Sequence, residues 1–271
     1  MDNRYCFLQS QNWFNKIMNS KYTRDTILGG AIIIKQPKFG YRINSDSIFL
    51  AAAVPATVNN YILDIGAGTG AISLVLAKRP QKLNILAVEN FPIHVKLLKE
   101  NILINKFSEQ ISVVNSDIST LRIVLSNKKF NHIVSNPPFY QKKRNQLPTD
   151  MGRRVSFYET EVSLKDWIKY CVDLLVIGGS FTLIIPYSRY DEILDVFFEY
   201  FFTIRTLNLL PRQGEEPKRV IIQGWLKGEK KVHKLDSLEL HQKGSNGFTR
   251  FAEDILRRGK ILKLAEPLAD S

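Results

Sequence analysis

Apolar residues fall into short runs and into longer segments with helical spacing, and polar or glycine-rich stretches separate the two kinds. The short runs are rich in aliphatic and β-branched side chains and are bounded by turn residues, so each predicts a buried strand. They lie at residues 61–65, 84–89, 111–115, 132–135 and 180–185. The longer amphipathic segments predict helices at residues 71–79, 92–105, 164–176 and 190–202. Strands that alternate with helices imply a mostly parallel α/β sheet with helices on both faces.

The rest of the pattern adds two strands and one helix. Residues 204–210 and 220–227 are predicted to be long strands joined by a loop rich in Pro, Gly and charge. Such a pair favours an antiparallel edge strand and completes a seven-stranded sheet. Nearer the start, Asp46-Ser47 predicts the N-cap of a helix over residues 48–53. Gly178-Gly179 predicts a turn ahead of the following strand.

The 271 residues are expected to form one main domain, residues 26–271, preceded by a polar N-terminal extension, residues 1–25. No apolar run is long enough to span a bilayer, and the N-terminus lacks the layout of a secretory signal. The cysteines, Cys6 and Cys171, form neither a disulfide framework nor a metal-binding spacing. We therefore expect a cytoplasmic protein that binds no metal and no membrane.

A glycine-rich turn, Gly66 to Gly70, follows one predicted strand and opens the next predicted helix. Gly66, Gly68 and Ala71 match the dinucleotide pattern G-x-G-x-x-A, so the turn alone leaves an NAD-dependent oxidoreductase open. Asp64 distinguishes between the two candidate cofactors, NAD and S-adenosylmethionine. A carboxylate just before the turn would repel a pyrophosphate, whereas it favours the ammonium and sulfonium groups of S-adenosylmethionine.

Acidic and amide side chains at the neighbouring strand ends complete the expected cofactor site. Glu89 ends the next predicted strand, where its carboxylate can accept hydrogen bonds from the two ribose hydroxyls. Asp117 follows the third strand and can accept from the adenine amino group, although it also suits a helix N-cap. The full set of expected cofactor-binding residues is Asp64, Gly66, Gly68, Gly70, Glu89, Asn90, Asp117 and Asn136.

Asn136-Pro137-Pro138-Phe139 follows the predicted strand at 132–135. Two prolines end the strand ladder and stiffen the turn, because neither has a backbone N–H. An amide oxygen and a free proline carbonyl can accept the hydrogens of an NH2 group, and an aromatic face can stack on its planar carrier. We predict that Asn136, Pro137 and Phe139 are catalytic residues for methyl transfer to an exocyclic amine.

The net charge of +12 favours a nucleic-acid partner, and basic residues follow the Asn-Pro-Pro-Phe motif directly. A nucleobase must leave its stack to reach such a pocket, and single-stranded RNA loops offer splayed bases at low cost. We therefore predict an RNA substrate. The expected substrate-binding residues are Tyr140, Lys142, Lys143, Arg144, Arg153 and Arg154.

With the cofactor and amine motifs in place, the chain resembles a class I S-adenosylmethionine-dependent methyltransferase of the small-domain group. Three further stretches narrow the resemblance to the tRNA1(Val) (adenine(37)-N6)-methyltransferase family over residues 24–258. They are Gly40–Ser47, Lys218–Gln223, and Leu240-His241-Gln242 with Phe248 and Ile255-Leu256-Arg257. The resemblance implies a Rossmann-like fold and methylation of adenine N6 in tRNA near the anticodon. Phe139-Tyr140 reverses the family's usual Tyr-Phe order.

Other amines fit the same motif. An rRNA guanine N2-methyltransferase and an N5-glutamine methyltransferase of a release factor remain open. The glutamine enzymes usually carry a separate N-terminal helical domain, for which the chain before Tyr61 is short and strand-rich. Asp64 and the lack of a hydride-transfer site count against the oxidoreductase, and the intact motifs count against a non-catalytic RNA-binding relic.

Overall fold

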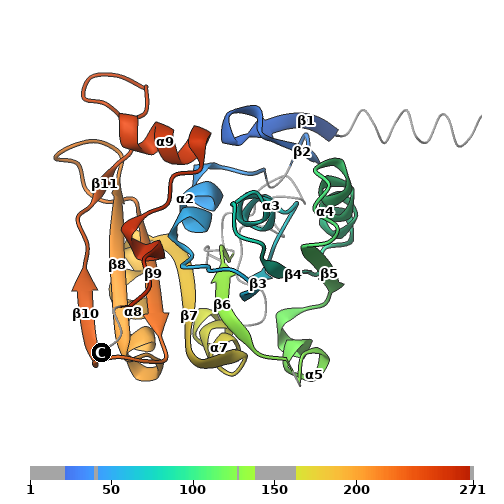
Figure 1. The fold of residues 1–271 in the computed structure, drawn as a ribbon. Coiled ribbons are helices and arrows are strands. Elements are labelled where there is room, and N and C mark those ends of the chain that lie inside the picture. Colours follow the sequence, from blue (N-terminus) through green and yellow to red (C-terminus); the bar gives the residue numbers. More distant parts are fainter. Residues whose placement is uncertain (1–21, 40–41, 127, 138–162, 269–271) are drawn as a thin grey trace, which may run out of the picture.

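The computed structural model describes residues 22–39, 42–126, 128–137 and 163–268, which form an α/β sheet layered between helices (Figure 1). Within this part of the chain the main sheet has nine strands in the order β10-β8-β9-β7-β6-β3-β4-β5, with β11 also paired to β8. Its parallel part comprises β3 Tyr61–Ile65, β4 Asn84–Glu89, β5 Ile111–Asn115, β6 Phe130–Ser135 and β7 Leu175–Pro186. The predicted bounds of β3, β4 and β5 are confirmed.

The part of the sheet beyond β7 differs from the prediction of seven strands with an antiparallel edge strand. The antiparallel strand, β9 Arg219–Trp225, lies inside the sheet between β7 and β8 Thr203–Leu210. Its Val220, Ile221 and Ile222 are all fully buried, as expected for an interior strand. The short strands β10 Lys231–Lys234 and β11 Leu238–Glu239 pair in parallel with β8 and occupy the edge instead. These two strands are short and largely polar, so the hydrophobic pattern of the sequence does not indicate them.

Both faces of the sheet are covered because its strands carry apolar side chains on both sides. Ile62 packs with one buried cluster and its neighbour Leu63 with the other. The first cluster includes α2 Ser45–Ala53, α3 Ala71–Ala77, α4 Pro92–Ile104 and α9 Arg250–Arg258. The second includes η2 Ile118–Thr120, α5 Leu121–Val124, α7 Leu164–Val172 and α8 Tyr190–Tyr200. The helices on both faces are therefore confirmed.

Three local predictions are wrong. The helix predicted over residues 164–176 ends at Val172, because the chain enters β7 at Leu175. Helix α2 begins at Ser45, and its N-cap is Asn44, whose side chain accepts from the Asp46 backbone N–H. The predicted turn at Gly178-Gly179 lies within β7, which already pairs with β6 through Leu175 and Phe130. The pairing register of β6 and β7 shifts between Phe130 and His132, and Gly178 has a positive φ of 76°. These features form a local bulge, and β7 continues through it.

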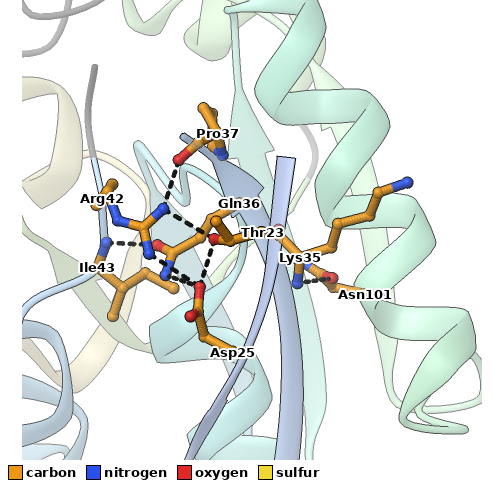
Figure 2. Close-up of polar contacts among 8 residues, drawn as sticks. All are labelled: Thr23, Asp25, Lys35, Gln36, Pro37, Arg42, Ile43 and Asn101. Atoms are coloured by element: carbon orange, nitrogen blue, oxygen red, sulfur yellow. Dashed lines mark hydrogen bonds and ion pairs between the residues drawn. The ribbon is translucent and has the colours of Figure 1, made fainter. Parts of the chain in front are cut away.

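A β-hairpin covers α4 and fixes the segment that enters α2. Strands β1 Tyr22–Ile27 and β2 Ile32–Pro37 pair through the 3-10 helix η1 Leu28–Gly30, so β1 crosses the predicted domain boundary at residue 26. The Arg42 guanidinium donates to Thr23 Oγ1, Asp25 Oδ2 and the Pro37 carbonyl (Figure 2). Gln36 Oε1 also accepts from the Ile43 backbone N–H, which ties the entry of α2 to the hairpin.

Two short 3-10 helices, η3 Tyr187–Arg189 and η4 Lys263–Ala265, complete the described elements. None of the helices in the described ranges has the length and apolar character needed to cross a bilayer.

Candidate active site at the carboxyl ends of the strands

The predicted glycine turn joins the end of β3 to the start of α3. Gly66, Gly68 and Gly70 all have positive φ, of 74°, 56° and 99°, which L side chains rarely adopt. The Gly66 and Ala67 backbone N–H groups donate to the Val88 carbonyl of β4 at 2.9 Å. The turn is therefore folded back against the neighbouring strand, as a close approach of backbone to ligand requires.

Asp64 lies beneath this turn and is fully buried. Its Oδ2 accepts from the Ser73 backbone N–H at 3.1 Å and from the Ser73 hydroxyl at 2.6 Å. Burial raises its pKa to about 7, against the lowering effect of the Ser73 hydrogen bonds. Its Oδ1 is buried with no hydrogen-bond partner among the described residues. An unpartnered carboxylate oxygen here fits a cofactor that brings positive charge.

Glu89 holds the glycine turn from the end of β4. Its Oε2 accepts from the Gly68 backbone N–H at 2.8 Å, and its Oε1 accepts from the backbone N–H groups of Asn90 and Phe91 at 3.0 and 2.8 Å. The carboxylate thus shapes both the turn and the entry of α4. Oε2, which accepts a single hydrogen bond, keeps acceptor capacity, and the predicted ribose contact stays a prediction.

Asn90 and Asp117 lie at the ends of β4 and β5 and contact each other, with Asn90 Nδ2 donating to Asp117 Oδ2 at 2.9 Å. Asp117 Oδ1 caps η2 by accepting from the Ser119 backbone N–H and hydroxyl. Burial raises the pKa of Asp117, but the hydrogen bonds from Ser119 and Asn90 outweigh it and lower the pKa overall. The helix-cap interpretation is confirmed, and the adenine contact stays a prediction.

Asn136 and Pro137 follow β6, whose Ser135 pairs with Ile65 at the end of β3. Asn136 is therefore adjacent to the glycine turn. Its Nδ2 donates to Ser47 Oγ of α2 at 3.4 Å, whereas its Oδ1 is buried with no partner among the described residues. Pro137 is buried. Several predicted residues lie outside the described ranges: Phe139, Tyr140, Lys142, Lys143, Arg144, Arg153 and Arg154.

Three residues at this edge of the sheet were not predicted from the sequence. Asn101 of α4 holds the turn, because its Nδ2 donates to the Thr69 carbonyl at 2.9 Å. Its Oδ1 accepts from the Lys35 backbone N–H at 2.7 Å (Figure 2). Trp167 of α7 lies beside Gly66, 3.8 Å from the position of a Cβ there, and its buried indole N–H has no partner among the described residues. Ser47 is the third.

Asn101 carried a readable signal, since it is a polar residue on the buried face of an amphipathic helix. Ser47 ends the Gly40–Ser47 stretch that indicated the family, but Ser47 and Trp167 are both far in sequence from the cofactor and amine motifs, so the fold brings them to the site.

Comparison with known proteins identifies the family. Residues 39–154 match the family model of the methyltransferase small domain. The chain is 32% identical over 187 residues to the tRNA1(Val) (adenine(37)-N6)-methyltransferase of Bacteroides thetaiotaomicron, an alignment that covers 68% of this chain and 77% of the relative. The relative of the same name from Glaesserella parasuis is 30% identical over 217 residues, covering 78% and 88%. The chain belongs to the tRNA1(Val) (adenine(37)-N6)-methyltransferase family.

Solved structures share the fold of this methyltransferase. A predicted O-methyltransferase, protein Atu636 from Agrobacterium tumefaciens, matches with a TM-score of 0.64 and 23% identity, covering 79% of this chain and 96% of that one. The Thermus thermophilus 16S rRNA N2 G1207 methyltransferase, solved with AdoMet and guanosine, matches with a TM-score of 0.55 and 19% identity, covering 76% and 50%. The predicted Rossmann-like class I fold is confirmed.

Membership of a methyltransferase family also decides between the two cofactors left open by the glycine turn. The methyl donor of this methyltransferase is S-adenosylmethionine, and the NAD-dependent oxidoreductase is excluded. The buried, unpartnered Asp64 Oδ1 fits the positive charge of that donor.

Proposed function

We propose that this methyltransferase transfers the methyl group of S-adenosylmethionine to the exocyclic N6 amine of an adenine in tRNA, near the anticodon. The observation that carries the proposal is the Asn136 amide oxygen, which is buried at the glycine turn and has no partner among the described residues. A buried acceptor without a donor is energetically unfavourable, so a ligand that brings N–H groups is the natural partner.

Asn136 and Pro137 prepare the amine for attack. The lone pair of adenine N6 is delocalised into the ring, which makes the nitrogen a poor nucleophile. If Asn136 Oδ1 and the Pro137 carbonyl accept its two hydrogens, the nitrogen moves toward tetrahedral geometry and the lone pair localises on it. The same oxygens stabilise the positive charge that develops on nitrogen. The product ammonium is acidic enough to lose its proton to water, so no strong base is needed.

The cofactor would be held by the residues that surround the turn. When bound, S-adenosylmethionine supplies an electrophilic methyl carbon on a sulfonium centre. Asp64 offers a carboxylate oxygen for its ammonium group, and Glu89 Oε2 offers an acceptor for its ribose hydroxyls. Asp117, with Asn90 beside it, offers an acceptor for its adenine amino group. Gly66, Gly68 and Gly70 let the backbone come close, because none carries a Cβ.

Charge and family favour tRNA over the other amine substrates. The net charge of +12 suits a polyanion. Phe139 and Tyr140 would stack on and enclose a flipped base, while Lys142, Lys143, Arg144, Arg153 and Arg154 would hold the phosphates. The relatives from Bacteroides and Glaesserella are named for adenine N6 in tRNA, which favours this base over guanine N2 or a glutamine amide.

Replacing Asn136 by Ala tests the proposal. Loss of one preorganised polar contact to the developing charge should lower turnover on tRNA by about 10²–10³-fold. Cofactor affinity, measured by calorimetry, should stay close to that of the wild type. Asn84→Ala is a matched control, because Asn84 is the first residue of β4 and lies at the amino end of the strand, away from the site.

The recipient is identified by offering methyl-labelled S-adenosylmethionine with tRNA, rRNA or a release factor in parallel. We expect the label in tRNA. Label in release-factor glutamine and not in RNA, or full turnover in Asn136→Ala, would contradict the proposal.

A further inference from the structure

We propose that Ser47 is a positioning residue that fixes the Asn136 amide so that its oxygen faces the substrate amine. The inference rests on the proposed function, since it concerns the task assigned to Asn136 Oδ1. It adds to the site a residue from α2, an element that carries none of the cofactor or amine motifs.

An asparagine has to be oriented before it can serve as an acceptor. Its amide presents an oxygen on one side and an NH2 group on the other, and rotation of the amide by half a turn exchanges them with little change of shape. With the NH2 group toward the pocket, Asn136 would offer donors to a substrate that itself brings donors. Catalysis of the proposed kind therefore needs a group that engages the nitrogen side of the amide.

Ser47 is placed to do this. Its hydroxyl oxygen lies 3.4 Å from Asn136 Nδ2, and its residue is only 2% exposed. In this arrangement Ser47 Oγ accepts from the amide nitrogen and Asn136 Oδ1 is the atom left without a partner among the described residues. The separation is long for a hydrogen bond, and catalytic contacts of this kind tighten once substrate is bound.

The helix that carries Ser47 is fixed at both ends. At its start, Arg219 of β9 forms an ion pair with Asp46, with Nε 3.0 Å from Oδ2. At its end, Gln223 of β9 donates to the Ala53 carbonyl at 3.0 Å, and Arg79 donates to the carbonyls of Ala51 and Val54. A catalytic side chain is held accurately when its support lies on a rigid element. Two of the stretches that indicated the family, before α2 and in β9, thus meet behind Asn136.

The test compares Ser47→Ala with Ser47→Thr in the full chain. Ser47→Ala removes the acceptor, so kcat for methyl transfer to tRNA should fall about tenfold, since small misplacements of a catalytic group slow reactions strongly. The dissociation constant for S-adenosylmethionine, measured by calorimetry, should change by less than about threefold, because the cofactor contacts remain. Ser47→Thr keeps the hydroxyl and should recover most of kcat.

Two further variants complete the design. Ser45→Ala removes a hydroxyl from the same turn of α2 and should leave kcat unchanged. Ser47→Cys keeps nearly the same volume with a much weaker acceptor, so it should show the loss of kcat even if Ser47→Ala proves unstable. Wild-type kcat in both Ser47→Ala and Ser47→Cys, or an equal loss in Ser47→Thr, overturns the inference.

The two proposals fail in different ways. An error in the proposed substrate shows in the wild-type enzyme, as label in rRNA or in a release factor. An error about Ser47 shows only in the variants, assayed on whichever recipient the wild type methylates.

Discussion

At the base of the glycine turn, Asp64 carries a carboxyl group whose pKa burial raises from 3.8 to about 7. In the unfolded chain the same group has its ordinary pKa near 4. Between these values the folded protein binds a proton that the unfolded chain does not. The free energy of unfolding therefore falls as the pH rises from about 4 to about 7. The ionised carboxylate destabilises the protein without ligand, and a bound cation would relieve this.

Asp64→Asn should remove this pH dependence. The amide oxygen can still accept from Ser73, but no buried charge forms at high pH. We expect the variant to gain melting temperature relative to the wild type by several degrees more at pH 8 than at pH 5. Cofactor binding at pH 8 should weaken, because the carboxylate is lost. Thermal unfolding at both pH values and calorimetry check the two effects, and an equal shift at both pH values would show that Asp64 is not the source.

In the connection from β3 to α3, the packing of α4 limits which residue can occupy position 70. Gly70 has a φ of 99°, and a Cβ there would lie 2.5 Å from Leu98 Cδ1 of α4. Two separate penalties follow from adding a methyl group. One is the backbone strain of a positive φ, and the other is the displacement of Leu98.

Gly70→Ala should lower the free energy of unfolding by about 2–4 kcal/mol, the sum of backbone strain and crowding. Gly30→Ala is the matched control, since Gly30 has nearly the same φ (97°) and its Cβ would meet no atom within 4 Å. It should lose only about 1–2 kcal/mol, from strain. Urea unfolding of both variants measures the difference, and equal losses would refute the crowding at Leu98.

Much of the fold could be predicted from the sequence, for reasons that particular elements illustrate. Strands β3, β4 and β5 are short runs rich in aliphatic residues and bounded by turn residues, so the hydrophobic pattern located their bounds. Strand β7 continues through Gly178-Gly179 because its partner β6 extends beside it, which is tertiary information. The interior position of β9 likewise depends on which strands it pairs with, and its own pattern does not reveal this.

Some residues of the candidate site could likewise be predicted from the sequence, and others could not. Asp64, Glu89 and Asn136 were predictable because each lies at or next to the carboxyl end of a strand, and parallel strands bring these ends together. Ser47 and Trp167 were not, because their places depend on how α2 and α7 pack across the sheet. The basic residues after the Asn-Pro-Pro-Phe motif lie outside the described ranges and stay predictions.

For the molecule as a whole, the predicted functional residues lie together at the carboxyl ends of the parallel strands. The glycine turn, Glu89 and Asn136 meet there, and α2 and the hairpin support them from the side. A positive net charge of +12 would draw a polyanionic substrate toward the protein, while the amine motif selects the atom to be methylated. Charge and motif together favour RNA, and the family favours adenine in tRNA.

The identity of the methylated nucleoside distinguishes adenine N6 from the other amines that fit the Asn-Pro-Pro-Phe motif. The wild-type enzyme is incubated with unmodified tRNA and methyl-labelled S-adenosylmethionine, and the tRNA is then digested to nucleosides and separated. We expect the label to co-migrate with N6-methyladenosine and to form about 10²–10³-fold more slowly in Asn136→Ala. Label in N2-methylguanosine, or no labelled nucleoside while a release-factor glutamine is methylated, would contradict the proposed function.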